Sequence, residues 1–356
     1  MTTARKRLVD PAVTRWYHCV RRAFLLGDEH GGLTNRKAWI ENRIEELSQV
    51  FAISAGGFSI LDNHLHLLVR LDPEVAKGWS NAEVAGRWAL LYPPRNRQRE
   101  VVPVTQEWIA KRAADQQWIA KRREQLSSLS WYMKALKEPL ARLANLQDDC
   151  DGAFWASRFK SIAILDELAL LQVCAYIDLN PLAAGLTFLP EKSPYTSITR
   201  RVEHAWPKLT RADFDAALRG LVVEHLPSGE AEQSHWLCPL EDRRSQGAAR
   251  EGMLAGLSLP KYWLLLDHTA RLFREGKATL DAAVAPILER LGTTAEVWQQ
   301  RLTQLKTKFS CRKVTGRVLA TTRAVLAEAA RRLGRHHLVN LLDVDEESVP
   351  RLAPDG

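Results

Sequence analysis

The sequence predicts an α+β fold in which an antiparallel sheet is followed by a helical C-terminal region. Segments with strand character occur in the first part of the chain, and after about residue 200 no strand pattern persists. Residues 259–342 instead show apolar positions at helical spacing between short breaks. The 356 residues, 46% of them hydrophobic, can bury a sizeable core and are enough for two domains. We therefore expect one domain over residues 1–200 and a helical C-terminal domain over residues 201–356.

The first elements are expected in the order strand, helix, strand, strand. Residues 14–26 are rich in aromatic and β-branched side chains. Residues 35–51 carry apolar side chains at helical spacing, with Asn35 available as the N-cap. Residues 52–61 form a second strand, whose Gly-Gly pair is typical of a bulge. The third strand, 61-LDNHLHLLV-69, follows so closely that we expect a tight hairpin between the two.

An insertion of about residues 73–125 is expected next. Residues 73–105 are rich in Pro, Gly, Asn and Arg and indicate a long loop. The repeated sequence WIAKR, at 108–112 and again at 118–122, is interpreted as two adjacent stripes of one solvated helix. An amphipathic helix over residues 126–145 follows.

A fourth strand and a further helix complete the predicted sheet domain. Residues 153–165 have strand character, and Asp166 is a suitable N-cap for a helix over residues 167–180. The resulting order, β-α-β-β-α-β plus an extra helix, is typical of a ferredoxin-like antiparallel sheet. Such a sheet has its helices on one face and can leave the other face open.

The composition excludes several classes of protein. A charged fraction of 26% and 12 tryptophans argue against disorder, and no apolar run is long enough to cross a bilayer. The basic N-terminus is followed by no apolar region, so we expect no signal peptide. Five scattered cysteines without a CxxC pair predict reduced thiols in a cytoplasmic protein, not a disulfide frame or a zinc site.

The charge distribution makes nucleic acid a candidate partner. The net charge is +8, and residues 87–123 hold nine Lys and Arg against three acidic residues. A basic segment of this kind is also what a solvated helical face with extended side chains would show. Both interpretations remain open from composition alone.

Two histidines in the third strand are the first candidate site residues. Residues i and i+2 of a strand point to the same face, so His64 and His66 would stand side by side. Leu65, Leu67 and Val69 would then point into a core on the other face. The pair is either a metal clamp or two partly buried histidines that bond to backbone groups, since an HxH motif also arises by chance.

A second constellation, 176-YIDLN-180, favours the metal clamp. On a helix Tyr176 and Asn180 are i and i+4, so the phenol and the amide project from one stripe. Two imidazoles, an amide oxygen and a phenol suit phosphoryl transfer assisted by Mg²⁺ or Mn²⁺, with tyrosine attacking to give a 5′-phosphotyrosine. The alternatives are an amphipathic packing tyrosine and an asparagine that caps a helix C-terminus.

At this point the residues resemble the HUH-type single-tyrosine transposases, in particular the long REP-associated tyrosine transposase-like group. The blocks that carry the resemblance, in this order, are 62-DNHLHLLV-69, 128-SLSWYMKALKEPLARLAN-145, 153-AFWASRFKS-161 with 166-DELALL-171, and 176-YIDLNPLAAG-185. The resemblance extends over about residues 14–190 and continues through 257–277 and 286–292.

The resemblance implies metal-dependent cleavage and rejoining of single-stranded DNA beside hairpins formed by palindromic repeats. It makes His64 and His66 metal ligands, Asn180 the third ligand, and Tyr176 the nucleophile. It further implies Mg²⁺ or Mn²⁺ as cofactor, single-stranded or hairpin DNA as partner, and a cytoplasmic, nucleoid-associated bacterial protein. A monomer and a homodimer both remain compatible with one tyrosine per chain.

The resemblance also has two departures, and the sequence leaves other functions open. Asp62 stands where the family often has a small residue or proline, and Ala183 replaces a basic residue. A hairpin-binding protein that no longer cuts DNA is the main alternative. A histidine-based phosphodiesterase would need a second histidine motif, which the sequence lacks.

Four basic residues are the expected DNA contacts. Arg158 and Lys160 lie on the strand before the helix that carries Tyr176, where they would bind phosphates. The alternative is a pair of exposed basic positions on an edge strand. Arg122 and Arg123 of the basic segment are the further candidates.

Overall fold

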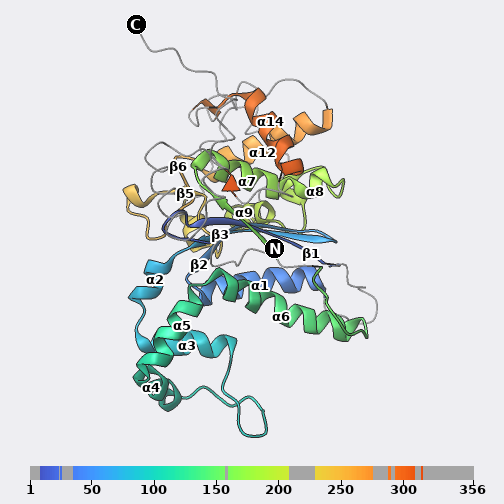
Figure 1. Ribbon diagram of the computed structural model, residues 1–356. Coiled ribbons are helices and arrows are strands. Elements are labelled where there is room, and N and C mark those ends of the chain that lie inside the picture. Colours follow the sequence, from blue (N-terminus) through green and yellow to red (C-terminus); the bar gives the residue numbers. More distant parts are fainter. Residues whose placement is uncertain are drawn as a thin grey trace, which may run out of the picture.

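A computed structural model shows an α+β fold built on one antiparallel sheet with helices on both sides (Figure 1). The structure describes residues 9–23, 25, 35–156, 159–207, 229–275, 288–289, 293–308 and 314–315. The strands of the sheet are β1 (Trp16–Arg22), β2 (Ile53–Ile60), β3 (His64–Leu71), β4 (Lys160–Ile164) and β7 (Val314–Thr315). They lie in the order β2-β3-β1-β4-β7, and the first four pair with one another in antiparallel orientation.

The alternation of β3 separates its side chains as the sequence predicts. Leu65, Leu67 and Val69 are at most 1% exposed and lie in the core on one face of the sheet. His64 and His66 project from the other face. The Gly-Gly bulge is confirmed, because the pairing register between β2 and β3 shifts between Ala55 and Gly57.

Two helices cover the face that carries Leu65 and Leu67. They are α1 (Arg36–Val50) and α6 (Leu129–Gln147), which pack against each other and share one core with β1, β2 and β3. Asn35 caps α1 as predicted, since its side chain accepts from the backbone N–H groups of Lys37 and Ala38 at 3.0 and 3.1 Å. Pro139 lies inside α6, which continues through it.

The opposite face is covered as well, so the expectation of an open face is wrong. The covering helices are α7 (Glu167–Asp178), α9 (Ser197–Ala205), α12 (Leu259–Glu275) and α14 (Ala295–Lys308). Figure 1 shows them on the side of the sheet away from α1 and α6. α7 is apolar on nearly all sides, and it shares a second core with Ile162, Ile164 and the apolar residues of α12. Contacts between residues far apart in the chain decide which helix covers which face, and local sequence patterns do not reveal such contacts.

The insertion after β3 is mainly helical, also within residues 73–105, where a long loop was expected. It contains α2 (Pro73–Gly78), α3 (Asn81–Leu91), α4 (Gln106–Ala114) and α5 (Gln116–Leu126). Ser80 and Glu83 form a capping box that starts α3. The two WIAKR copies lie on two helices and not on one, because Asp115 ends α4 and caps the N-terminus of α5.

The C-terminal part contains short strands in addition to helices, which corrects the purely helical expectation. β5 (Glu241–Asp242) and β6 (Leu254–Ala255) pair with each other, and β7 pairs in parallel with β4. The remaining short helices are α8 (Asn180–Ala183), α11 (Gly229–Ser234) and the 3-10 turns Pro190–Lys192 and Arg244–Gln246. Described residues on both sides of position 200 share one core, and the division into two domains stays a prediction.

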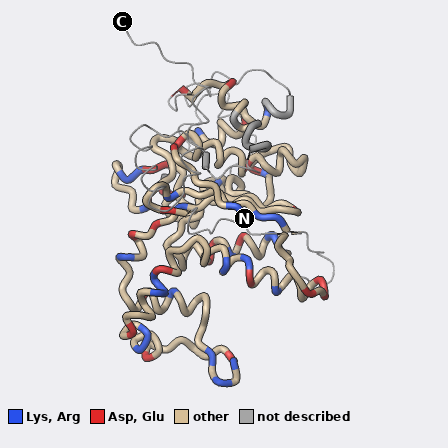
Figure 2. Tube along the Cα trace, in the orientation of Figure 1, with Lys and Arg blue, Asp and Glu red and all other residues tan. Residues whose placement is uncertain are grey.

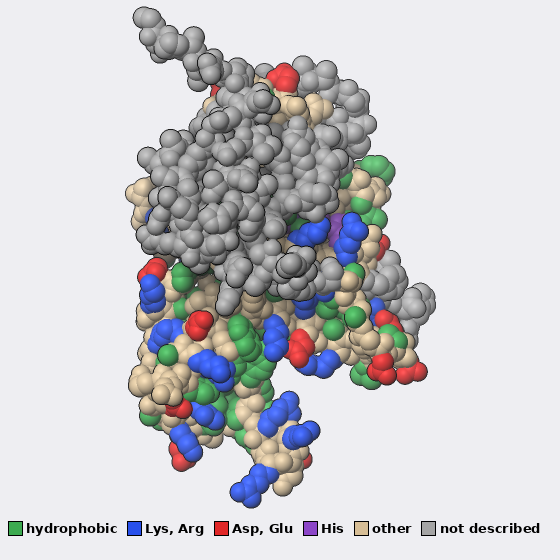
Figure 3. Space-filling model, viewed as in Figure 1, with side chains coloured by type: hydrophobic (Ala, Val, Ile, Leu, Met, Phe, Trp, Pro, Cys, Tyr) green, Lys and Arg blue, Asp and Glu red, His purple; other side chains and the backbone are tan. Residues whose placement is uncertain are grey.

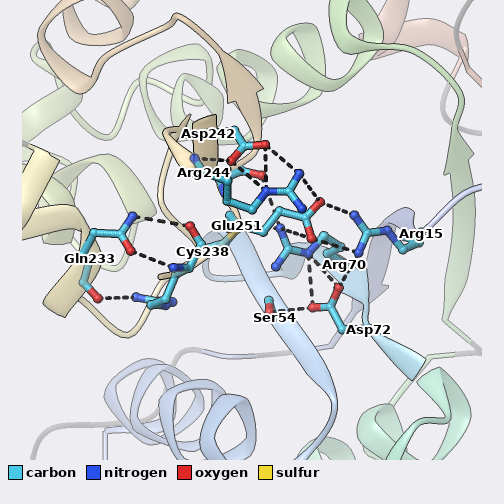
Figure 4. A network of polar contacts seen from close by, with 11 residues as sticks. Arg15, Ser54, Arg70, Asp72, Gln233, Cys238, Asp242, Arg244 and Glu251 are labelled. Atoms are coloured by element: carbon cyan, nitrogen blue, oxygen red, sulfur yellow. Dashed lines mark hydrogen bonds and ion pairs between the residues drawn. The ribbon is translucent and has the colours of Figure 1, made fainter. Parts of the chain in front are cut away.

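A buried ionic network ties the C-terminal part to the end of the sheet (Figure 4). Asp72 accepts from Arg70 at 2.9 Å, from Arg15 at 2.9 Å and from Ser54 at 2.8 Å. Arg15 also pairs with Glu251, whose backbone carbonyl accepts from Arg70 at 3.1 Å. The network lies at the end of β3 that is remote from His64.

Two further observations concern the described ranges as a whole. No helix in them combines the length and the apolar character that crossing a membrane requires. Four of the five cysteines fall within these ranges, and all four are free thiols. The fifth, Cys311, lies outside the described residues.

Candidate metal and nucleophile site

The fold brings the four predicted site residues together from two distant parts of the chain. His64 and His66 stand on β3, and Tyr176 stands on α7, which lies over that face of the sheet. The expected helix over residues 167–180 ends at Asp178, and Asn180 is the first residue of α8. Asn180 is therefore not a helix C-cap, because Leu179 takes that place.

The Asn180 amide lies between the two imidazoles. Its Oδ1 is 3.3 Å from His64 Nε2, and its Nδ2 is 3.3 Å from His66 Nε2. The two histidine rings are perpendicular, with centroids 4.8 Å apart. Tyr176 presents its ring edge-on to His66 at a centroid distance of 5.4 Å and shares a side-chain hydrogen bond with Asn180. The imidazoles, the amide and the phenol thus form one contiguous cluster.

A third histidine, which the sequence analysis missed, lies behind this cluster. His18 of β1 is fully buried, and its Nε2 is 3.0 Å from Nδ1 of His66. When neutral His66 carries its proton on Nδ1, it donates to His18 and leaves the Nε2 lone pair toward Asn180. Metal-binding histidines commonly use the second ring nitrogen in this way, which fixes the ring orientation. His18 projects from β1 on the same face as His66. The period-two alternation of side chains along β1 is the feature of the sequence that could have assigned His18 to this face.

Burial controls the protonation of the cluster. Burial lowers the pKa of His64 and, together with the neighbouring histidines, lowers the pKa of His66 well below its usual value. Burial also lowers the pKa of His18 to about 3. All three imidazoles are therefore neutral at pH 7, which is the state that a metal ion requires. Burial raises the pKa of the Tyr176 phenol above its usual value, against the effect of the hydrogen bond with Asn180.

The segment from Tyr176 to Asn180 is held in place by a buried carboxylate between them. Asp178 accepts from Ser197 Oγ at 2.6 Å, from the backbone N–H of Ile198 at 3.0 Å and from the Tyr262 hydroxyl at 2.6 Å. These donors belong to α9 and α12. The end of α7 is thereby fixed to two elements of the covering layer.

The donor set fits a divalent cation. Within the described ranges, no group of three or more His, Cys, Asp and Glu side chains could hold a metal ion. A metal ion bound by His64 and His66 would therefore need a ligand of another kind, and the Asn180 amide lies beside both imidazoles. With its proton on Nε2, His64 donates to Asn180 Oδ1 at 3.3 Å; with its proton on Nδ1, it donates to the Asn63 side-chain oxygen and leaves His64 Nε2 and Asn180 Oδ1 as two acceptors. Adjacent ligands of an octahedral Mg²⁺ are about 3 Å apart. In the second tautomer, a cation between these two acceptors would remove their repulsion.

The structure places the other residues that the sequence analysis singled out near the site in different positions. Lys160 is exposed on β4, whereas Arg158 lies outside the described residues. Asp62 forms an ion pair with Lys37 of α1 and does not join the histidines. Ala183 is exposed near the end of α8.

The two arginines expected to bind DNA from the insertion have contacts inside the protein. The guanidinium of Arg122 packs on the rings of Trp88 and Trp118, with its Cζ atom 4.2 and 5.2 Å from the two ring centroids. Arg123 donates to backbone carbonyls of the α2 segment, among them that of Trp79 at 2.6 Å. Exposed basic side chains of this segment are Lys111 of α4, Lys121 of α5 and the arginines of the loop between α3 and α4, which projects at the bottom of Figures 2 and 3. A DNA contact by Arg122 or Arg123 stays a prediction.

Comparison with known proteins gives little further information. No family model matches the chain, and no curated protein matches it. One match among solved structures is a REP-associated tyrosine transposase bound to a REP hairpin, with 13% sequence identity and a TM-score of 0.30. This match covers 52% of this chain and 78% of that chain. A likeness at this level carries no argument about activity.

Proposed function

We propose that the chain is a metal-dependent single-stranded DNA endonuclease and strand transferase of the HUH tyrosine type. The observation that carries the proposal is that Tyr176 and Asn180 lie in contact with His64 and His66. The two pairs of residues are more than a hundred positions apart in the chain. The sheet order and the helices α1 and α6 on one face support a ferredoxin-like core. The sequence resemblance supports hairpins of palindromic repeats as the substrate.

The residues have distinct roles in the proposed reaction. The phenolic oxygen of Tyr176 attacks the scissile phosphorus, a Tyr–O–P bond to the 5′-phosphate forms, and the bond to the 3′-oxygen breaks. A free 3′-hydroxyl results, and its attack on the phosphotyrosine rejoins strands without an external energy source. Mg²⁺ or Mn²⁺, held by His64, His66 and Asn180, would polarise the phosphate and neutralise charge on the departing oxygen. His18 and Asp178 hold this machinery in position.

Covalent capture of labelled DNA tests the proposal. Hairpin DNA from the flanks of the protein's own gene is labelled at the 5′ or the 3′ end and incubated with Mn²⁺ or with a chelator. The proposal predicts a metal-dependent adduct that carries the DNA downstream of the cut and is absent from Tyr176→Phe.

The alternative is a hairpin-binding protein that does not cut. The raised pKa of Tyr176 favours this alternative, because a phenol that holds its proton is a weaker nucleophile. Tight hairpin binding without an adduct under any metal would establish it.

A further inference from the structure

The end of the sheet beside the histidines carries two basic side chains on the same face. In the antiparallel pair of β1 and β3, Arg22 lies opposite His64 and Val20 lies opposite His66. Across β1, Lys160 of β4 lies opposite Val20. Residues directly opposite each other in an antiparallel pair project from the same face. Arg22 and Lys160 therefore share the face on which the histidine pair stands.

Both cations are accessible, and Arg22 stands beside the histidine pair. The side chains of Arg22 and Lys160 are exposed. Arg22 is the cross-strand neighbour of His64, so the two side chains stand next to each other on this face. Among the residues that the structure describes, no carboxylate forms an ion pair with Arg22, and the nearby Asp62 is paired with Lys37.

We propose that Arg22 and Lys160 form a phosphate-binding subsite that holds the DNA backbone next to the histidine pair. Arg22 is one strand spacing from His64, about 5 Å, and Lys160 is two spacings from His66, about 10 Å. A strand whose scissile phosphate lies at the histidines would pass both cations on its way to the sheet edge. The planar guanidinium can bind two oxygens of one phosphodiester, and the ammonium serves as a second point charge. This inference rests on the proposed function, since it takes single-stranded DNA as the ligand.

The subsite is tested by the salt dependence of DNA binding without metal. A fluorescent single-stranded hairpin oligonucleotide is titrated with the full-length protein in chelator, and anisotropy is measured at several salt concentrations. Each phosphate contact on a single strand contributes about 0.7 to the slope of log K against log salt. Arg22→Ala and Lys160→Ala should each bind several-fold more weakly and reduce the slope by about that amount. Arg22→Lys should keep most of the slope, because the charge is retained.

Arg142→Ala is the matched control. Arg142 is an exposed arginine of α6, on the other side of the sheet, and it loses the same charge when replaced. If Arg22→Ala and Arg142→Ala have the same affinity and the same slope of log K against log salt, the subsite is refuted. It is also refuted if the wild-type protein does not bind the oligonucleotide.

The subsite and the proposed function fail in different ways. An Arg22-dependent slope without a covalent adduct would refute the cleavage function and leave the subsite intact. A metal-dependent adduct that forms equally well at all DNA concentrations in Arg22→Ala and Lys160→Ala would refute the subsite and leave the function intact. Circular dichroism of each variant verifies the fold, and Lys160→Ala decides the outcome if Arg22→Ala does not fold.

Discussion

The buried carboxylate between Tyr176 and Asn180 gives the sharpest prediction about the site. Asp178 is 2% exposed and accepts hydrogen bonds from Ser197, Ile198 and Tyr262. Asp178→Ala removes the acceptor and leaves the Ile198 N–H and the Tyr262 hydroxyl without a partner, at about 1–3 kcal/mol each, whereas Ser197 Oγ can still donate to the Phe58 carbonyl at 3.3 Å. Removal of a desolvated carboxylate offsets part of this cost, so we expect the free energy of unfolding to fall by about 3 kcal/mol.

Two milder substitutions separate the contributions. Asp178→Asn keeps one acceptor oxygen and should cost about 1 kcal/mol, as should Tyr262→Phe, which removes a single hydrogen bond. Urea unfolding followed by tryptophan fluorescence measures these differences, and the rate of adduct formation should fall most in Asp178→Ala. If Asp178→Ala unfolds within about 0.5 kcal/mol of the wild type, the carboxylate does not anchor the site.

The same carboxylate predicts a pH dependence of stability. Burial raises the pKa of Asp178 in the folded protein, against the hydrogen bonds from Ser197 and Tyr262 that lower it. The folded state therefore binds this proton more tightly than the unfolded state, and the group's contribution to stability decreases as pH rises from the unfolded value through the raised one. In Asp178→Asn this contribution should vanish. An unchanged pH profile would contradict the assigned environment.

Further predictions concern the ionic network and the metal site. Arg70→Ala removes one of the two arginines that pair with Asp72, and because Arg15 still donates to this carboxylate, unfolding experiments should show a loss smaller than the value of about 3–5 kcal/mol for a buried charge left without any partner. Mn²⁺ at about 100 times its Kd should stabilise the protein by about 2.7 kcal/mol in thermal melts, and His64→Ala with His66→Ala should abolish this effect. His18→Leu should weaken Mn²⁺ binding by about 10–100-fold in calorimetry, because His66 loses its orienting partner. Since burial lowers the pKa of His66, Mn²⁺ affinity should stay constant down to about pH 6.5; a decline already above neutral pH would contradict this.

The parts of the fold that the sequence predicts depend on local signals. The alternation of 61-LDNHLHLLV-69 separates the core face from the histidine face because the side-chain period of a strand is two. Asn35 and Asp166 cap the helices that follow them, because their oxygens accept from backbone N–H groups within three residues. These interactions involve neighbours in sequence, and sequence patterns can reveal them.

The errors arise where distant contacts decide the structure. α7 and α12 cover the face that was expected to be open, and their packing against the sheet joins residues a hundred or more positions apart. The prolines and arginines around residues 92–100 obscured helix α3, which ends just before them. His18 belongs to the site only because β1 pairs with β3, and no motif links it to His66 in the sequence.

Mass spectrometry of the covalent product tests the central claim most directly. The tryptic peptide of residues 161–192 contains Tyr176 as its only tyrosine. After incubation with hairpin DNA and Mn²⁺, followed by trypsin and nuclease, this peptide should carry a nucleotide joined through its 5′-phosphate to Tyr176. An adduct on another peptide, or unmodified peptide under conditions where the hairpin is bound, would contradict a tyrosine nucleophile beside a histidine-bound metal.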